Sequence, residues 1–590
     1  MTTMPTGPGH DLKERRYVLL VFAALAILYL LTLNNQWAIE PDSAAYLALG
    51  RSIAEGRGME YNGAPAWGVP PLLPVLIAGS RLLFGPAYWP INLAISLAGL
   101  GTAFLAYLTV RRLAPEVGAD DVPLALAALL ITGSSARLLI DSTRILTDEP
   151  CAFFVALGLY AFVRAREGHW AWCWAGLGAM LLATAARLPA GVILVGLFVG
   201  LALEFRREGY RGRLLATLAG MVGVAAGALG WWFLVRGRSI GGPDYFVTIF
   251  ERFQFGLRDR WVQLAEGPFR LPGALCEAIT GQELQGFNVV PTALIFFGLW
   301  TAARRGQWVW VCPVLAYVAF LLGLGGSAVA PRYLLPVMPM IVYALAVGTV
   351  EAVARLRRRA AAPSPERIGR GRRVALAIVT VFCVAVSLPK AVREVVRMRH
   401  ADFYETYEHG EWKGTVDLGR YLGSLRESGL AGLADRVLAP DPAVVHYLSG
   451  LRTDYSIWYP KADRFLGYGP PWSPADFAKL AAAGPWRFVV LPTNKEAWSE
   501  DAVRAIEATG AFRLPPERFR GLVLYTRLPA EGRTVPRAPG RLHLLQIPRS
   551  WGRHRRAREV GHSIIPNPSR FSTPKTGSGK LDAIALAPRE

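Results

Sequence analysis

The chain has 590 residues, of which 52% are hydrophobic and 18% are charged, and its formal net charge is +21. Its apolar residues gather in runs of roughly 17 to 25, the length of helix that crosses about 30 Å of hydrocarbon, which excludes an ordinary soluble globular protein. The Lys and Arg residues lie in short clusters between these runs rather than on one soluble face, which argues against a nucleic-acid partner and indicates membrane topology.

The amino terminus predicts the first helix of a polytopic α-helical membrane protein. A basic patch at Lys13, Arg15 and Arg16 precedes the apolar run 17–33. The polar run Asn34-Asn35-Gln36 follows at the point where small residues would mark cleavage of a signal peptide. We therefore expect an uncleaved helix, with residues 1–16 on the cytoplasmic side.

Hydropathy predicts about eleven spanning helices between residues 17 and 390. A further apolar stretch, 70–84, is ambiguous. The predicted spans are 17–33, 89–110, 122–140, 150–166, 169–187, 188–205, 214–236, 289–303, 307–325, 333–354 and 374–390.

The positive-inside rule decides how the stretch 70–84 is placed. If this stretch lies on the surface instead of crossing, all five later basic clusters fall in the cytoplasm; if it crosses, all five fall outside. The clusters are Arg111/Arg112, Arg164/Arg166, Arg206/Arg207/Arg211/Arg213, Arg304/Arg305 and the run from Arg355 to Arg373. We therefore expect a multi-pass protein of the plasma (inner) membrane. Its extracytoplasmic side, here called the outer face, should carry 34–88, 141–149, 187, 237–288, 327–332 and the domain after the last helix.

The first outer loop, 34–88, contains a carboxylate just beyond the first helix. Small and apolar residues recur at helical spacing from Asp42 to Arg57, which predicts an amphipathic helix. Asp42 is then open to two interpretations. It could be the N-cap of that helix, or it could face a water-filled crevice as a catalytic base.

Four more charged residues lie on the predicted outer face. Asp148 and Glu149 open a predicted helix, where acidic residues in the first turn also stabilise the helix dipole. Arg187 and Arg332 lie at helix ends and could simply mark the interface. However, both are on the face that the positive-inside rule disfavours for arginine, and phosphate binding would explain them.

Residues 391–529 predict a small α/β domain on the outer face. Short strand-like runs at 437–439, 487–491 and 521–525 alternate with helical patterns at 443–448 and 501–508. The tail 530–590 is rich in Arg, Pro, Ser and Gly without apolar periodicity, which predicts a disordered basic tail.

The cysteines and histidines predict no metal or disulfide framework. Four of the five cysteines lie in apolar runs. His400, His409 and Glu411 could bind a metal, but their spacing favours a solvated loop. We expect no cofactor; a divalent metal is possible but nothing indicates one.

The ordered set of motifs resembles the GT-C superfamily of polyprenyl-phosphate-dependent glycosyltransferases. The similarity is greatest to the family 39 group, which includes protein O-mannosyltransferases and the bacterial aminoarabinose transferase of lipid A. It covers roughly residues 15 to 390. The motifs are Pro41-Asp42-Ser43-Ala44-Ala45-Tyr46, Gly63-Ala64-Pro65, Pro70-Pro71-Leu72-Leu73-Pro74, Thr147-Asp148-Glu149-Pro150, Ala183-Thr184-Ala185-Ala186-Arg187-Leu188-Pro189 and Arg332-Tyr333-Leu334-Leu335-Pro336.

The resemblance implies a GT-C-like fold, a surface-lying helix after the first loop, and roles for seven residues. Asp42 would be the catalytic carboxylate, and Asp148 or Glu149 a second acidic site near the sugar. Residues of the matching motifs would bind substrate: Tyr46, Arg187, Arg332 and Tyr333. The partners implied are a polyprenyl-phosphate sugar donor and a lipid, glycan or protein acceptor of the cell envelope.

The sequence departs from the family pattern in two places. Its acidic motifs are a single Asp and an Asp-Glu pair, not the Asp-x-Asp of metal-dependent oligosaccharyltransferases. A lysine that the aminoarabinose transferases carry before the Pro-rich turn is missing, and Trp67-Gly68-Val69 stands in its place. The second departure argues against aminoarabinose as the donor sugar.

The residue types fit an inverting glycosyl transfer with Asp42 as general base and Arg332 or Arg187 as the cation beside the departing phosphate. Two other functions stay open. A transporter or flippase of lipid-linked sugars would also be polytopic, although it would more often show internal repeats and charges deep in helices. The obvious charge pair, Arg137 with Asp141, has the spacing of a structural ion pair. A non-catalytic envelope assembly protein is the other alternative.

Overall fold

The computed structural model divides the chain into two units, Met1–Ala530 and Glu531–Glu590. The described residues all belong to the first unit. They are 8–117, 121–167, 171–235, 257–284, 286–324, 329–359, 364–399, 411–455, 473–493 and 497–528. The predicted tail, with His400 and His409, lies outside these ranges.

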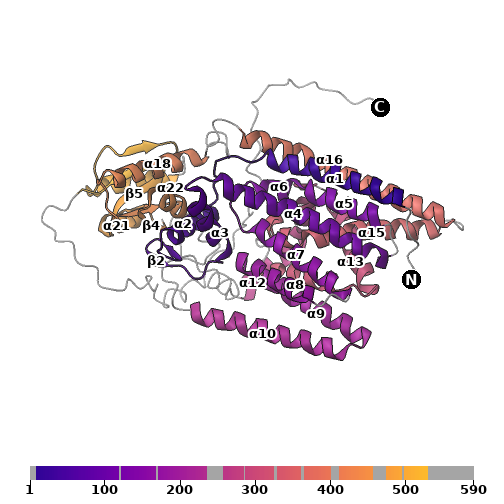
Figure 1. Ribbon diagram of the computed structural model, residues 1–590. Helices are drawn as coiled ribbons and strands as arrows, with labels where there is room; N and C mark the ends of the chain where they lie inside the picture. The colour runs from indigo at the N-terminus through magenta and orange to yellow at the C-terminus, as the bar shows by residue number, and fades with distance from the viewer. Residues whose placement is uncertain are drawn as a thin grey trace, which may run out of the picture. The chain divides into compact units, whose positions relative to one another are not determined.

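The first part of the chain is a helix bundle, and each of the eleven predicted spans coincides with one or two helices (Figure 1). The protein is thus polytopic and α-helical, as predicted. The helices of the bundle are α1 (Pro8–Leu30), α4 (Trp89–Leu113), α5 (Asp121–Gly133), α6 (Ala136–Ser142), α7 (Asp148–Arg166), α8 (Ala171–Ala186), α9 (Ala190–Glu208), α10 (Arg211–Val235), α12 (Leu257–Thr280), α13 (Val289–Arg304), α14 (Trp308–Gly323), η3 (Pro331–Val337), α15 (Met338–Arg359) and α16 (Pro365–Met398), with the short η1 (Ala114–Val117) after α4.

Fewer than eleven of these helices are long and apolar enough, by length and composition alone, to cross a membrane. Within the described ranges, three stretches are long and apolar enough to cross a membrane, Trp89–Glu116, Pro331–Arg359 and Glu366–Met398. The bent pair α5 and α6 would make a fourth. Several other helices are apolar but shorter, among them α8, α13 and α14. The count of eleven therefore stays a prediction.

Two details of the bundle differ from the predictions. The predicted span 122–140 is broken into α5 and α6 with a bend of 49°, and Ser135 caps the second piece by accepting a hydrogen bond from the Leu138 N–H at 3.4 Å. The segment 237–288 was placed on the outer face with no helix predicted in it, but it contains the 24-residue helix α12. This helix is amphipathic: Leu275 is buried while Phe269 is 86% exposed. It lacks a continuous apolar run, so hydropathy misses it.

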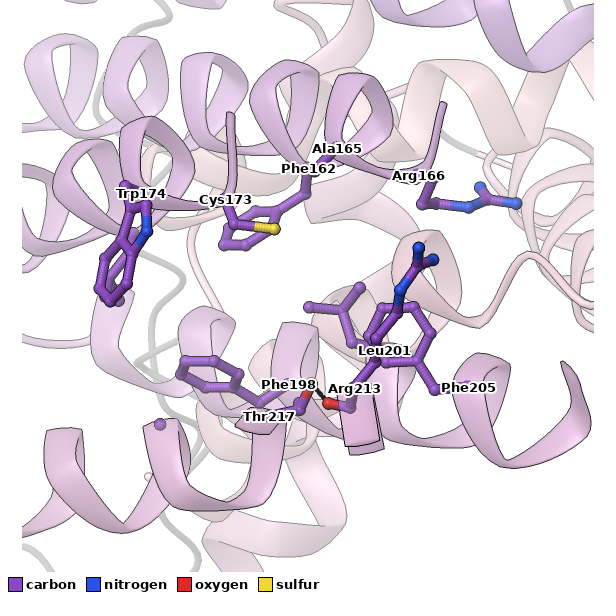
Figure 2. Close-up of a pocket in the computed structure, with 12 residues that line it drawn as sticks. Phe162, Ala165, Arg166, Cys173, Trp174, Phe198, Leu201, Phe205, Arg213 and Thr217 are labelled. Carbon is purple, nitrogen blue, oxygen red and sulfur yellow. Dashed lines mark hydrogen bonds between the residues drawn. The ribbon is translucent and has the colours of Figure 1, made fainter. Parts of the chain in front are cut away.

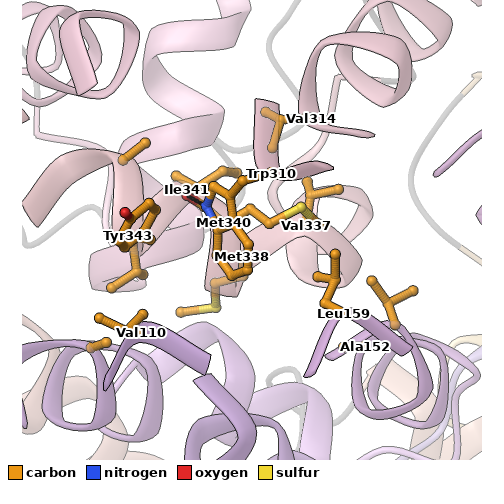
Figure 3. Packing of buried hydrophobic residues seen from close by; sticks show 14 of the residues in the cluster. Val110, Ala152, Leu159, Trp310, Val314, Val337, Met338, Met340, Ile341 and Tyr343 are labelled. Atoms are coloured by element: carbon orange, nitrogen blue, oxygen red, sulfur yellow. Dashed lines mark hydrogen bonds between the residues drawn. The ribbon is translucent and has the colours of Figure 1, made fainter. Parts of the chain in front are cut away.

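The core of the bundle is packed by side chains from α4, α7, α14 and α15, as Figure 3 shows. Trp310 and Tyr343 meet edge to face with ring centroids 5.1 Å apart. Their polar atoms are satisfied inside the core. Trp310 Nε1 donates to the Met340 carbonyl at 3.3 Å, and Tyr343 Oη donates to Gln307 at 2.8 Å. Burying large aromatic groups without leaving a donor unpaired makes this part of the bundle a stable support for its ends.

The first outer loop folds into α2 (Pro41–Ala54), a hairpin of β1 (Glu60–Tyr61) and β2 (Ala64–Pro65), and α3 (Leu72–Phe84). The hairpin turns at Asn62 and Gly63, both with positive φ, as an Asn-Gly turn requires. Helix α3 has 13 residues, about 20 Å at 1.5 Å per residue, which is too short to cross about 30 Å of hydrocarbon. It packs against α2 and leaves Leu82 and Leu83 exposed. Its length thus fits the prediction that 70–84 does not cross.

The carboxyl-terminal part of the first unit is an α/β domain with strands at the three expected runs. Its sheet has the order β4-β3-β5-β7-β6, with β3 parallel to both β4 and β5, and β7 antiparallel to β5 and β6. The strands are β3 (Arg436–Ala439), β4 (Arg452–Tyr455), β5 (Trp486–Pro492), β6 (Glu517–Phe519) and β7 (Leu522–Thr526), and the helices are α18 (Glu411–Glu427), α19 (Pro442–Ser449), α21 (Pro474–Ala483) and α22 (Ala497–Ala508).

The close approach of α2 and α3 depends on Gly50. A Cβ at this position would lie 2.4 Å from Ile77 Cγ2 and 3.1 Å from the Pro74 carbonyl oxygen. We expect Gly50→Ala to force the helices apart and to cost about 1 to 3 kcal/mol, seen as a lower melting temperature of the purified full-length protein. Gly79→Ala is the matched control, because a Cβ at Gly79 meets no atom within 4 Å. Equal melting temperatures for the two variants would contradict the packing described.

Candidate active site

Asp42 does not cap the helix that it begins. The N-cap of α2 is Glu40, and Pro41 and Asp42 are the first two helical residues. Ser43 completes the cap, since its Oγ accepts from the Glu40 N–H at 3.1 Å. The capping interpretation of Asp42 is therefore wrong: proline prefers the first helical position, which moves the cap to Glu40. The Asp42 side chain is 45% exposed.

The start of α2 is tied to the bundle by Glu40. This residue pairs with Arg144, and both side chains are at most one-fifth exposed, at 20% and 15%. The backbone of Arg144 also forms a parallel bridge with Ala38. The segment between α6 and α7 thus fixes the position from which α2, and with it Asp42, begins.

Arg332 is the cation next to Asp42. Its Nη2 lies 3.6 Å from Asp42 Oδ2 and donates a hydrogen bond to Tyr333 Oη at 2.9 Å. Arg332 and Tyr333 belong to η3, at the start of the long apolar stretch that continues as α15. Two residues that are 290 positions apart in sequence are therefore brought into one ion pair at the end of the bundle.

A second ion pair lies beside the Tyr333 ring. The Arg187 guanidinium is 4.5 Å from the centroid of that ring and pairs with Asp148, which is only 4% exposed. Arg187 follows the last residue of α8, and Asp148 is the first residue of α7. Together with Asp42 and Arg332, these residues form a continuous set, here called the Asp42–Asp148 cluster, with two carboxylates, two guanidiniums and one phenol.

Glu149 does not join this cluster. It is fully buried, and within the described ranges its carboxylate oxygens have no hydrogen-bond partner. Neighbouring residues on an α-helix point about 100° apart, so a carboxylate one position after Asp148 faces another side of α7. Arg137 and Asp141, in the nearby helix α6, form a bidentate pair at 2.6 and 2.8 Å, the structural ion pair expected from their spacing.

Tyr46 is buried on α2. It lies one helical turn after Asp42 on the same face of α2 and is 4% exposed. Its ring belongs to an apolar group that includes Trp37 and Leu47. The structure thus gives Tyr46 a packing position beneath Asp42.

Two cavities lie elsewhere in the bundle. The first, of about 160 Å³, is enclosed by α7, α8, α9 and α10 (Figure 2). Figure 2 shows Trp174 on one side of it and the guanidiniums of Arg166 and Arg213 on the other. The second, of about 190 Å³, has an apolar lining that includes Cys276 and Cys383. None of the seven predicted site residues lines either cavity, and such apolar walls suit hydrocarbon better than a sugar.

The described residues hold no group of three or more His, Cys, Asp and Glu side chains that could bind a metal ion. Of the predicted metal candidates, His400 and His409 lie outside the described ranges, and Glu411 begins α18. The absence of a metal requirement stays a prediction.

Sequence reasoning missed the residues that hold α2 in place. Glu40 directly precedes the motif that begins at Pro41, and Arg144 lies three residues before Thr147. A proline at the first helical position is a recognisable helix start. The Asn62-Gly63 pair is likewise a strong hairpin signal. The pairing of Glu40 with Arg144, by contrast, is a long-range contact for which the sequence has no local signal.

Comparison with known proteins supports the same fold. A family model described as dolichyl-phosphate-mannose-protein mannosyltransferase matches residues 68–232. The crystal structure of ArnT from Cupriavidus metallidurans bound to undecaprenyl phosphate matches with a TM-score of 0.55 at 17% sequence identity, over 87% of this chain and 98% of that chain. The apo structure of that protein matches with a TM-score of 0.55 at 18% identity over the same shares, 87% and 98%. No curated protein matches this chain in sequence.

These matches confirm the predicted resemblance to the GT-C superfamily and its family 39 group, and the GT-C-like fold. The family match spans α3 to α10 and includes Asp148, Glu149 and Arg187. It does not reach Asp42 or Arg332.

The Arg187–Asp148 pair generates a stability prediction. Removing one partner of a buried ion pair leaves a charge without compensation, which costs about 3 to 5 kcal/mol. We expect Arg187→Gln and Asp148→Asn each to lower the melting temperature of the full-length protein, and the double variant to lose clearly less than the sum. Strictly additive losses would show that the two side chains do not interact.

Proposed function

We propose that this protein is a membrane glycosyltransferase that moves a sugar from a polyprenyl-phosphate donor to an acceptor on the extracytoplasmic face, with inversion. The observation that carries the proposal is the ion pair of Asp42 with Arg332, at 3.6 Å, in which the carboxylate stays half-exposed. A base and a phosphate-binding cation stand side by side there, within reach of solvent and at an end of the helix bundle.

Asp42 acts as the general base of this reaction. Its carboxylate takes the proton of the acceptor hydroxyl while that oxygen bonds to the anomeric carbon of the sugar. The bond from this carbon to the phosphate oxygen breaks, and its electron pair leaves with the lipid phosphate. Glu40 and Ser43 form the cap of α2, so the Asp42 carboxylate is not needed as its cap.

Arg332 stabilises the departing phosphate. The donor carries one negative charge as a phosphodiester, and the product phosphate monoester carries more, so a fixed guanidinium interacts more strongly with the product side. Arg187 is already paired with Asp148, and its guanidinium lies 4.5 Å from the centroid of the Tyr333 ring. It adds positive potential, while Arg332 makes the direct contact.

The proposal names the class of donor and leaves the sugar and the acceptor open. The family model is described by dolichyl-phosphate mannose and protein, whereas the similar solved structure is of ArnT bound to undecaprenyl phosphate. A lipid-linked phosphate is common to both. Trp67, 42% exposed at the position of the missing lysine, is compatible with a donor other than aminoarabinose.

Replacing Asp42 tests the catalytic role. We expect Asp42→Asn to reduce glycosyl transfer at least 100-fold, because the amide cannot accept the hydroxyl proton. Binding of undecaprenyl phosphate to the purified protein should change little. Transfer is measured by mass spectrometry of envelope glycans in cells that lack the protein and are complemented with each variant.

The control for this test is Glu55→Gln, which neutralises an exposed carboxylate at the other end of α2 and should leave transfer intact. Unchanged transfer by a well-folded Asp42→Asn variant would refute the assignment of the base. It would also favour a transporter or an assembly role.

Arg332 gives a complementary result. We expect Arg332→Gln to weaken binding of undecaprenyl phosphate at least 10-fold, because a charge-assisted contact to phosphate is lost. Arg332→Lys should keep part of the affinity, since it retains the charge without the planar fork. Both are measured by titration of the purified protein in detergent. Equal affinity of all three proteins would rule out Arg332 as the phosphate ligand.

A further inference from the structure

The α/β domain contacts the first outer loop through α19, a helix of eight residues. Val444 and Tyr447 of this helix belong to the same apolar group as Trp37 and Tyr46 of the first outer loop. Tyr447 is only 6% exposed. The α/β domain thus places the Tyr447 side chain in the apolar group of the first outer loop.

Tyr447 reaches the start of α2 through Trp37. The two rings meet edge to face, with centroids 5.0 Å apart and an angle of 83°. Trp37 is 1% exposed, and its Nε1 donates to Ser43 Oγ at 2.6 Å. Ser43 is the cap partner of Glu40 and the direct neighbour of Asp42. Two contacts therefore separate the Tyr447 ring from the turn that carries the proposed base.

Tyr447 also holds the other end of α2. Its carbonyl oxygen accepts a hydrogen bond from Arg51 Nη1 at 3.0 Å, and the same guanidinium lies 5.4 Å from the centroid of its ring. The Tyr447 hydroxyl shares a hydrogen bond of 2.8 Å with the hydroxyl of Tyr88, just before α4. Tyr447 thus contacts the end of α2 directly through Arg51, reaches its start through Trp37, and contacts Tyr88 at the end of the outer loop.

The hairpin of the outer loop makes a second contact with the domain. Asn62 exchanges two hydrogen bonds with the Thr453 backbone, at 2.5 and 2.7 Å. The Asn62 N–H donates to His446 Nε2 at 3.3 Å. Burial lowers the pKa of His446 to about 4, so at neutral pH the ring is uncharged and this nitrogen can accept. A Cβ at Gly63 would lie 2.7 Å from Arg452 Nε, so the hairpin fits closely against β4.

We propose that the α/β domain is a positioning element for the transfer reaction, and that Tyr447 is its principal positioning residue. Through Trp37 and Arg51 it sets the orientation of α2, so that Asp42 faces Arg332 and the acceptor hydroxyl. This inference rests on the proposed function of Asp42. Tyr447 itself does not touch the reacting atoms.

Such a role predicts a loss of turnover without a loss of donor binding. A displacement of about 1 Å in a catalytic group can reduce a rate on the order of 100-fold. The phosphate ligand Arg332 belongs to η3 and is held by the bundle rather than by α19. Loosening α2 therefore moves the base and leaves the phosphate site in place.

The test compares Tyr447→Leu with Tyr447→Phe in the full-length protein. The Leu variant loses the ring contacts to Trp37 and Arg51, whereas the Phe variant loses only the hydroxyl bond to Tyr88. We expect Tyr447→Leu to lower kcat at least 10-fold, with unchanged KM for the donor and unchanged affinity for undecaprenyl phosphate. Tyr447→Phe should stay within about threefold of the wild type. The assay follows release of polyprenyl phosphate from polyprenyl-phosphate sugars extracted from host membranes, with extracted envelope material as acceptor.

Hydrogen exchange of α2 supplies a readout that does not depend on activity. Amides of residues 41–54 should exchange faster in Tyr447→Leu than in the wild type, and those of η3 and α15 should not change. Tyr421→Phe is the control, because Tyr421 bonds Glu517 on an exposed surface of the same domain. It should alter neither exchange nor turnover.

The outcomes separate this proposal from the proposed function. If Tyr447→Leu keeps full turnover, or if α2 exchanges at the wild-type rate, the positioning role is refuted whatever Asp42 does. If α2 loosens but Asp42→Asn transfers normally, the contact exists and the catalytic assignment fails. Should Tyr447→Leu not fold, Trp37→Phe replaces it, because this variant removes only the hydrogen bond to Ser43 and part of the ring. Full turnover and unchanged exchange of α2 in Trp37→Phe would then overturn the proposal.

Discussion

The arrangement of the site depends on how the first turn of α2 is capped. Glu40 and Ser43 satisfy the cap, and Pro41 fixes the first helical position, so Asp42 follows as a carboxylate that the helix itself does not need. Glu40 also pairs with Arg144, which anchors the same turn to the bundle. The cap formed by Glu40 and Ser43 thus leaves Asp42 without a capping role and fixes its position. The Arg332 ion pair then has a partner of defined position rather than a mobile loop residue.

The rest of the fold brings distant segments to that turn. Asp42 comes from the first outer loop, Asp148 and Arg187 from the ends of α7 and α8, and Arg332 from η3. The GT-C-like bundle provides the rigid frame for these four segments, with large aromatic side chains such as Trp310 buried and fully hydrogen-bonded. The α/β domain adds a second set of contacts to α2, through Tyr447. The candidate site is thus assembled from segments that lie far apart in the sequence. Each segment is held by a contact that can be removed separately.

Much of this could be predicted from the sequence, and the failures have physical reasons. Apolar runs located the helices because crossing hydrocarbon requires a long apolar segment. Five of the seven predicted site residues meet in one cluster, with Tyr333 between the two ion pairs. Helix α12 was missed because an amphipathic helix with Pro268 and Pro272 has no such run. Asp42 was open to a capping role because Asp is a common cap, although Pro41 favoured Glu40. Glu149 was grouped with Asp148 because the two are adjacent in sequence. On a helix, however, adjacent side chains point in different directions. The Tyr447–Trp37 contact joins residues 410 positions apart, and no local pattern predicts it.

The central claim is that a lipid phosphate binds beside Arg332 with Asp42 next to it. A cryo-electron microscopy structure of the full-length protein in a lipid nanodisc with undecaprenyl phosphate tests this most directly. We predict density for the phosphate within hydrogen-bonding distance of the Arg332 guanidinium, with the Asp42 carboxylate open to the same space. Phosphate density elsewhere, for example beside Arg166 and Arg213 at the cavity of Figure 2, with the Asp42–Asp148 cluster closed to the lipid, would contradict the account.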